Sequence, residues 1–300
     1  LNFKLLKYLP KYGFLGSRLS YIVVFFFSIF KLHKILKKDK PKYLMIHLMT
    51  FIPLFLLLFF NFETKFILRI SGYPKMNFFR KFLWKLTLKK IYLITCPSEN
   101  TLKYIKSLNL VDNSKIKLLY DPIISVKEIN KKKNEKIDLN NFYLAVGRLT
   151  KQKNFMFLCR VFKEIIKEND QIKLLIAENG EEEIKLKEFI KKNNLENNIT
   201  LLGYIDNIFP YFKNSKGFIL TSLWEDPGFV LVEAAFCRTL VLTSDSPGPK
   251  ELIEDNFNGV VFKSNDINSF ENKFEILTNL SNKNYLRLNN LKGVKKFTVF

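Results

Sequence analysis

The stretch FYLAVGRLTKQKNFMFLCRVFKEIIKENDQIKLLIAE, residues 142–178, decides the fold of the second half of the chain. Its two ends, residues 142–146 and 172–178, are short and largely apolar, which is typical of strands buried on both faces of a parallel sheet. Between them, apolar side chains recur at helical spacing among lysines and glutamates. The order strand, helix, strand predicts a βα unit of a doubly wound α/β domain.

The same alternation continues along the rest of the second half. Helical stretches separate further apolar runs, which predict strands at residues 199–203, 217–222, 240–244 and 259–262. We therefore expect one Rossmann-like domain over residues 142–283, followed by a C-terminal helical segment over residues 284–300.

The first half of the chain repeats this pattern less regularly. A helix with Ser98 as its N-cap is expected over residues 98–110. Buried strands are expected within the segments KYLMIHLM (42–49), TKFILRIS (64–71) and KKIYLITCPS (89–98). These elements predict a second Rossmann-like domain over residues 1–125.

A chain of 300 residues is long enough for two domains of ordinary size. The segment VKEINKKKNEKIDLNN, residues 126–141, is polar and charged and has few large apolar side chains. It predicts a linker between the two domains. A cleft between domains is a common place for a ligand.

Positive charge is concentrated in the first half of the chain. Residues 1–140 hold 27 Lys and Arg against 8 Asp and Glu, whereas the remaining residues hold 22 against 20. The basic half also holds the long apolar runs, and this combination predicts a surface that meets anionic lipid. Basic patches also bind nucleic acid, but no nucleic-acid-binding motif accompanies the charge, so no nucleic-acid partner is expected.

The apolar run at residues 44–60 has 17 residues without a formal charge and raises the question of a membrane span. Spanning a bilayer as a helix takes about 20 residues, and His47 and Pro53 interrupt this run. A shorter run lies at residues 21–30. We expect both runs to form a buried strand–helix pair or an interfacial helix, with an integral membrane protein as the alternative.

Cysteine usage indicates a reducing compartment. Cys96, Cys159 and Cys237 are widely spaced and have only His33 and His47 as potential co-ligands, so neither a disulfide framework nor a zinc site is expected. A cytoplasmic protein is the simplest interpretation. The chain opens with leucine rather than methionine, and we expect it to lack its natural start.

A basic turn follows the strand predicted at residues 142–146. Gly147 stands at the strand end, and Arg148 and Lys153 precede the next helix. A glycine that allows close approach, with two cations at a strand-to-helix turn, is suited to cradle a pyrophosphate. Lys151 could serve in place of Lys153, and a solvated basic loop without a ligand is the alternative.

Two carboxylates flank a Pro-Gly turn in the segment LWEDPGFVLVEA. Glu225 lies in the loop before the turn and Glu233 in the second turn of the helix expected after it, so both acids can face one ligand. The helix start would offer to an anion the N–H groups of Gly228, Phe229 and Val230. Carboxylates can accept hydrogen bonds from hydroxyls, so a nucleotide sugar satisfies both features.

Several spaced segments resemble one family in the same order. GRLTKQKN, IAENGEEEIKLKEFI and ITLLGYIDNIFPYFKNSKGFILTSLWEDPGFVLVEAAFCRTLVLTSDSPGPKELI resemble the C-terminal half of retaining glycosyltransferases of family 4. The resemblance covers residues 142–263 and implies the GT-B fold, in which two Rossmann-like domains with parallel sheets face each other across a cleft. HLMTFIPL, RISGYPK and TCPSENT resemble the acceptor domain of bacterial members that extend lipid-linked polysaccharides.

The resemblance assigns roles to the residues of the second half. Arg148 and Lys153, next to Gly147, match the pair that grips the donor diphosphate. Glu225 matches the first acid of the E-x7-E motif, which lies beside the transferred sugar, and Glu233 matches the second, which holds the ribose hydroxyls.

Further donor and acceptor contacts are implied by the same resemblance. The segment 228–230 would supply N–H groups to the phosphates. Tyr204 lies in the loop that borders the base. His47 matches a histidine of the acceptor domain that faces the sugar.

The resemblance also implies the reaction. We expect transfer of a sugar from a nucleotide-diphosphate donor, UDP- or GDP-linked, to a lipid-linked saccharide in surface polysaccharide synthesis. No metal is expected, since no Asp-x-Asp pair is present, and no cofactor beyond the nucleotide sugar. A peripheral protein on the cytoplasmic face of the membrane is expected, with a non-catalytic membrane-associated nucleotide-binding protein as the alternative.

One feature of the family is not found in this sequence. Its members usually begin with a glycine-rich loop near the first strand, and no such loop occurs here. We therefore expect the N-terminal domain to lack its beginning.

Overall fold

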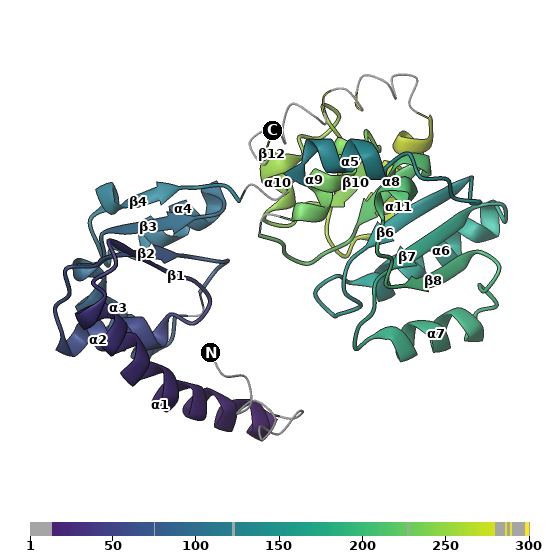
Figure 1. Cartoon of the computed structure of the whole chain (residues 1–300). Coiled ribbons are helices and arrows are strands. Elements are labelled where there is room, and N and C mark those ends of the chain that lie inside the picture. The colour runs from purple at the N-terminus through teal and green to yellow at the C-terminus, as the bar shows by residue number, and fades with distance from the viewer. Residues whose placement is uncertain are drawn as a thin grey trace. The chain divides into compact units, whose positions relative to one another are not determined.

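The computed structural model describes residues 14–74, 76–121, 124–226, 228–279, 286, 289 and 298–299. The chain divides into two compact units, Leu1–Leu119 and Tyr120–Phe300, each built on a parallel sheet (Figure 1). Most of the C-terminal helical segment expected at residues 284–300 lies outside the described residues.

The second unit contains a sheet of six parallel strands in the order β11-β10-β9-β6-β7-β8. The strands are β6 (Phe142–Val146), β7 (Lys173–Ala177), β8 (Ile199–Gly203), β9 (Gly217–Leu220), β10 (Val241–Ser244) and β11 (Val260–Phe262). Every strand expected in this half is present, within three residues of its predicted bounds. The chain runs outward from β6 to β8 and then returns to place β9 on the other side of β6, which is the topological switch point of a doubly wound sheet.

Helices cover both faces of this sheet. Consecutive side chains of a strand point to opposite faces, so each strand contributes to two separate cores. Tyr143 and Ala145 of β6 pack in one apolar core, and Phe142, Leu144 and Val146 pack in the other. The helices are α6 (Phe155–Glu168), α7 (Glu183–Lys192), α8 (Phe209–Asn214), α9 (Phe229–Phe236), α10 (Pro249–Leu252) and α11 (Ile267–Asn279).

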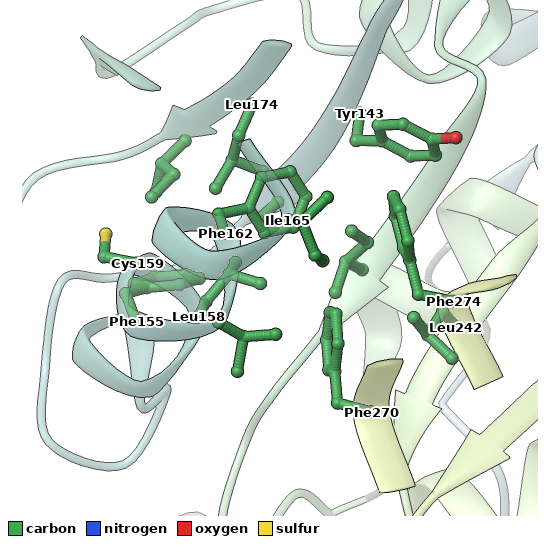
Figure 2. Packing of buried hydrophobic residues seen from close by; sticks show 14 of the residues in the cluster. Tyr143, Phe155, Leu158, Cys159, Phe162, Ile165, Leu174, Leu242, Phe270 and Phe274 are labelled. Atoms are coloured by element: carbon green, nitrogen blue, oxygen red, sulfur yellow. The ribbon is translucent and has the colours of Figure 1, made fainter. Parts of the chain in front are cut away.

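Aromatic side chains fill the core between β6, α6 and α11. Phe162 of α6 lies edge-on to Tyr143 and to Phe274, with ring centroids 6.3 and 5.7 Å apart (Figure 2). Phe270 of α11 packs against Phe262 of β11 at 4.9 Å. This core fixes α6 and therefore the turn that leads into it from β6.

The segment expected as a linker belongs to the second unit. Residues 126–132 form helix α5 (Val126–Lys132), which buries Ile129 in the core shared with α8 and α9. Asn207 donates a hydrogen bond from Nδ2 to the carbonyl of Lys132 over 3.1 Å. The division between the units therefore falls after Leu119 instead of after residue 125. One buried side chain is enough to dock a short helix whose remaining residues are polar.

The first unit contains a sheet of four parallel strands in the order β1-β2-β3-β4. The strands are β1 (Tyr43–Ile46), β2 (Lys65–Arg69), β3 (Leu93–Cys96) and β4 (Ile116–Leu118), and the helices are α1 (Phe14–Lys38), α2 (Phe51–Phe59), α3 (Phe78–Thr87) and α4 (Glu99–Ser107). Short 3-10 turns η2 (Leu88–Lys90) and η3 (Asn113–Lys115) precede β3 and β4. Ser98 caps α4 as predicted, because its side chain accepts a hydrogen bond from the amide of Thr101.

A separate pair of short parallel strands lies in the second unit. β5 (Ile124–Ser125) comes directly before α5, and β12 (Thr298–Val299) pairs with it. The last described residues of the chain therefore return to the start of this unit.

The apolar run at residues 44–60 divides into strand β1 and helix α2, which confirms the strand–helix pair. Its expected burial holds for one side of α2 but not for β1, where Tyr43 and Met45 are exposed. Pro53 lies in the first turn of α2, where a missing N–H breaks no hydrogen bond of the helix. In the part of the chain that the structure describes, no helix is both long enough and apolar enough to span a bilayer.

Candidate functional site

The loops that follow β6 and β9 meet at the carboxyl edge of the second sheet, because these two strands are neighbours. The amide of Leu223 donates to the carbonyl of Gln152 over 2.8 Å, and Gln152 Nε2 donates to the carbonyl of Trp224 over 2.8 Å. Thr221 Oγ1 donates to the carbonyl of Lys153, also over 2.8 Å. The two segments singled out in the sequence, GRLTKQKN and LWEDPG, are thus held side by side.

Lys153 and Glu225 form an ion pair at this junction. Lys153 Nζ lies 2.5 Å from Glu225 Oε1, and the two side chains are only 15% and 10% exposed. Lys151, the other lysine considered for this position, is exposed to solvent. The structure therefore places Lys153 on the carboxylate.

Gly147 makes room for Lys153. Its φ is +153°, and a Cβ at this position would lie 2.9 Å from Lys153 Cε and 3.0 Å from Cδ. The lysine stem thus passes directly over the backbone at the end of β6. The sequence predicts that this glycine lets a pyrophosphate approach closely; the group that approaches it in the structure is the lysine side chain, and the pyrophosphate contact stays a prediction.

The turn that carries Arg148 is braced by the loop after β7. The amide of Leu149 donates to the carbonyl of Asn179 over 3.0 Å, and the amide of Glu182 donates to the carbonyl of Leu149 over 2.9 Å. A Cβ on Gly180 would lie 2.4 Å from the carbonyl oxygen of Leu149, so only glycine fits there. Gly180 was not among the predicted site residues, although an Asn-Gly pair directly after a strand is a recognisable turn signal. Arg148 itself is exposed at the edge of the sheet.

The loop after β10 supports the backbone of Glu225. The amide of Glu225 donates to the carbonyl of Pro247 over 3.3 Å. Gly248 has a φ of +89°, and a Cβ there would lie 2.3 Å from the carbonyl oxygen of Glu225. Gly248 was not predicted as a site residue either, although it stands in the turn-forming run Ser-Pro-Gly-Pro.

Helix α9 begins where the Pro-Gly turn predicts it. Gly228 is its N-cap with a φ of +90°, and a Cβ on Gly228 would approach Glu225 Cβ to 3.2 Å. A glycine cap brings no side-chain acceptor of its own to the amides at the helix start. Phe229 and Val230 form the first turn and are half-buried. The positive end of the helix dipole therefore lies close to Glu225.

Glu233 occupies the second turn of α9, as predicted. It is half-buried, and burial raises its pKa to about 7, because the charged form is poorly solvated there. At neutral pH the carboxyl group therefore exchanges readily between its two protonation states. In either state it can form hydrogen bonds with a hydroxyl group.

Two further residues, Tyr204 and His47, were predicted for the site. Tyr204 directly follows β8, so it stands at the same sheet edge but two strands away from β6, and its side chain is exposed. His47 follows β1 in the first unit and is exposed. The roles of Tyr204 and His47 stay predictions.

The three cysteines, all within the described residues, are buried, and none of them is joined in a disulfide. Over the same part of the chain, no cluster of three or more His, Cys, Asp or Glu side chains is arranged to hold a metal ion. The site itself offers cations, a helix start and two carboxylates. This set suits a ligand that carries a diphosphate together with hydroxyl groups.

A comparison with protein families gives a match that includes every element of this cluster. The family described as Glycosyl transferases group 1 matches residues 126–290, which is more than half of the chain.

Two curated proteins show the extent of similarity in sequence. The chain is 31% identical over 246 residues to an uncharacterized glycosyltransferase of Methanocaldococcus jannaschii, covering 75% of this chain and 61% of that protein. It is 32% identical over 202 residues to the N-acetylgalactosamine-N,N'-diacetylbacillosaminyl-diphospho-undecaprenol 4-alpha-N-acetylgalactosaminyltransferase of Campylobacter jejuni, covering 66% and 54%. The chain thus matches 54–61% of the length of these two relatives.

A solved structure confirms the fold class. A glycosyltransferase of Rickettsia africae is similar with a TM-score of 0.74 at 16% identity, over 92% of this chain and 78% of that one. At this identity the likeness concerns the fold alone. The prediction of a GT-B protein with two Rossmann-like parallel-sheet domains is confirmed.

Proposed function

Because this chain belongs to the family Glycosyl transferases group 1, we propose that it transfers a sugar from a nucleotide-diphosphate donor to a lipid-linked saccharide. The transfer would retain the anomeric configuration and would serve surface polysaccharide synthesis. The contact between Lys153 and Glu225 at the switch point carries the proposal, because it sets a lysine suited to a phosphate beside a carboxylate suited to sugar hydroxyls.

The reaction exchanges one bond of the anomeric carbon for another. Its bond to the diphosphate oxygen breaks, its bond to an acceptor hydroxyl oxygen forms, and the hydroxyl proton leaves with the diphosphate or to solvent. Negative charge therefore grows on the leaving diphosphate. Stabilisation of this charge by Lys153, Arg148 and the start of α9 would lower the barrier by about 3 kcal/mol or more.

Glu225 would act beside the transferred sugar. The carboxylate is buried and paired with Lys153, so we assign it to orienting the sugar and stabilising positive charge on the ring, and not to forming a covalent bond. Donor binding would let Lys153 divide its contacts between Glu225 and the diphosphate.

Other donor contacts follow from the same arrangement. Glu233 would accept hydrogen bonds from the ribose hydroxyls, and the amides of residues 228–230 would face the phosphates. Tyr204 would border the base. His47 of the first unit would face the sugar from the acceptor side.

The lipid-linked acceptor is supported by the relative from Campylobacter jejuni, whose name specifies a saccharide carried on diphospho-undecaprenol. Residues 1–140 hold 27 Lys and Arg against 8 Asp and Glu, and this excess of positive charge supports contact with an anionic membrane. We therefore place the protein at the cytoplasmic face of the membrane as a peripheral protein.

Two measurements test the proposed function. Thermal unfolding with UDP-, GDP- and ADP-sugars should identify the donor, because a ligand that binds only the native state raises the Tm. The selected donor should then label a saccharide linked to diphospho-undecaprenol, with EDTA present, and NMR of the product should show the donor's anomeric configuration. Binding without transfer would favour the alternative, a non-catalytic nucleotide-binding protein, and loss of transfer in EDTA would contradict metal independence.

A further inference from the structure

Helix α3 exposes an apolar stripe to solvent. Phe78, Phe82 and Leu86 are spaced four residues apart on one side of the helix, and Phe79 lies next to them. These four side chains are between 47% and 88% exposed. The opposite side of α3 buries Leu83, Trp84 and Thr87 in the first unit, so the helix is already docked without the exposed stripe.

The stripe continues onto the neighbouring helix α2. The rings of Phe51 and Phe79 lie 6.2 Å apart between their centroids, and Phe55 connects Phe51 to Phe59 along α2 at 5.8 and 5.0 Å. Phe51 and Phe59 are exposed as well. We call this surface the aromatic face; it consists of Phe51, Phe59, Phe78, Phe79, Phe82 and Leu86.

The aromatic face has a positively charged border. At 3.6 residues per turn, Lys81 and Lys85 lie directly beside the stripe on α3, and Lys89 follows in η2; all three are exposed. Residues 64–98 contain no Asp or Glu, so no acid of this segment offsets these charges. Aromatic side chains bordered by lysines form the pattern of helices that lie in the interface of an anionic bilayer.

We propose that the aromatic face docks on an anionic phospholipid surface. The phenylalanine rings enter the boundary between headgroups and acyl chains, and Lys81, Lys85 and Lys89 contact the lipid phosphates. This inference rests on the proposed function, since a lipid-linked acceptor requires the enzyme to work at a membrane. A second copy of this chain is a less suitable occupant, because pairing two such faces would bring lysines against lysines.

Vesicle sedimentation of the 300-residue chain tests the proposal. The chain should bind vesicles of phosphatidylcholine with 30 mol% phosphatidylglycerol, a composition chosen to give roughly the surface potential of a natural anionic leaflet. Phe78→Ser with Phe82→Ser should lower the partition coefficient roughly tenfold or more. Lys81→Gln with Lys85→Gln should lower it about fivefold per lysine at low salt, and the difference should largely vanish at high salt.

Matched controls separate the aromatic face from general charge and hydrophobicity. Lys103→Gln with Lys117→Gln removes two exposed lysines of the same unit that lie outside the face. Ile184→Ser removes a side chain of the second unit that is 71% exposed. Both controls should bind vesicles like the unaltered chain. Equal losses in the face variants and their controls would overturn the proposal.

A second measurement reports insertion directly. A Phe78→Trp variant should show an additional fluorescence component that lipids brominated near the headgroup quench strongly. Absence of this quenching on bound vesicles would also overturn the proposal. The proposal would also be overturned if sedimentation velocity showed a dimer for the unaltered chain and a monomer for the serine variant, while both proteins bound vesicles equally.

Donor binding distinguishes failure of this inference from failure of the proposed function. The serine variant should keep the donor-induced rise in Tm, because the cluster around Lys153 lies in the other unit. One result would be a chain that binds vesicles through the aromatic face and yet neither binds nor transfers any sugar donor. That result would support the membrane-docking surface and refute the transferase function. If instead the chain transfers a sugar to a saccharide acceptor freed of its lipid but does not bind vesicles, the transferase function would be supported and the membrane-docking surface refuted.

Discussion

Lys153 and Glu225 are 72 residues apart in the sequence, yet Nζ and Oε1 lie 2.5 Å apart beside the junction of β6 and β9. At a switch point the chain leaves two neighbouring strands in opposite directions, and the ion pair joins the two loops that follow them. An anion that approaches Lys153 therefore also approaches the carboxylate of Glu225. The ion pair therefore links the two loops and also lies at the centre of the candidate site.

Removal of Lys153 should destabilise the second unit. Lys153→Ala leaves the carboxylate of Glu225 largely buried without its cation, which should lower the free energy of unfolding by about 2 to 3 kcal/mol. Urea unfolding of the single and double variants, with Glu225→Ala as the partner, measures the coupling. The double variant should be more stable than the sum of the two losses predicts, and strictly additive losses would show that the ion pair contributes nothing.

Glu225 and Arg148 should differ in their kinetic effects. Glu225→Ala should lower kcat roughly 100-fold while donor affinity changes little, because the change removes charge stabilisation at the sugar but frees Lys153 for the phosphates. Arg148→Ala should weaken donor binding and also lower kcat. Steady-state kinetics with calorimetric donor titration separates the two patterns. Lys151→Ala, a change in an exposed lysine of the same turn, serves as control, and small, equal effects in all three variants would remove Arg148 and Glu225 from the site.

Local patterns in the sequence predict most of the second unit. Strands β6 and β8 have the expected bounds, and α9 begins directly after the Pro-Gly turn. Both signals are local, because burial on two faces requires a continuous apolar run and a helix start requires a turn. The same patterns place the loops after β6 and β9 at one edge of the sheet, since parallel strands end on the same side.

Contacts between distant segments could not be predicted in this way. Gly180 and Gly248 matter because a neighbouring backbone passes within 2.4 and 2.3 Å of where their Cβ atoms would lie, and nothing near them in the sequence reports that approach. Helix α5 was expected as a linker because polar residues dominate it. Its position depends on Ile129, which contributes only one apolar side chain to the pattern.

The stability of the protein should depend on pH through Glu233. Its pKa is about 7 in the folded chain against 4.5 for an ordinary glutamate, so the folded state holds its proton more tightly than the unfolded state. This contribution is complete below pH 4.5 and is lost as pH rises through 7, by up to about 3 kcal/mol. Urea unfolding from pH 5 to pH 8 should show this loss in the unaltered chain but not in Glu233→Gln. A constant difference between the two proteins would contradict the shift.

Donor binding should change in the opposite sense with pH. Ribose hydroxyls donate to the ionised carboxylate of Glu233 better than to the protonated one, so affinity should rise between pH 6 and pH 8. Calorimetry in buffers of different ionisation enthalpy should detect protons released on binding at pH 7. Glu233→Gln should remove the proton release, and its persistence in that variant would assign it to another group.

Gly180 should be essential for the position of Arg148, although Gly180 itself has no side chain. A Cβ at this residue would lie 2.4 Å from the carbonyl oxygen and 2.5 Å from the amide nitrogen of Leu149, and neither atom can move without displacing the turn. Gly180→Ala should therefore lower the unfolding free energy by about 2 kcal/mol and weaken donor binding roughly tenfold or more.

Gly217→Ala is the matched control, because its Cβ would meet a side-chain atom, Leu277 Cδ2, at 3.1 Å, at the amino end of β9 and away from the site. A side chain can shift where a backbone cannot, so this variant should lose about 1 kcal/mol or less and bind the donor normally. Calorimetric titration with the donor, under conditions in which the same fraction of each variant is folded, separates a change in donor affinity from a loss of stability. Unchanged donor affinity in Gly180→Ala would mean that the turn carrying Arg148 is not held by the loop after β7.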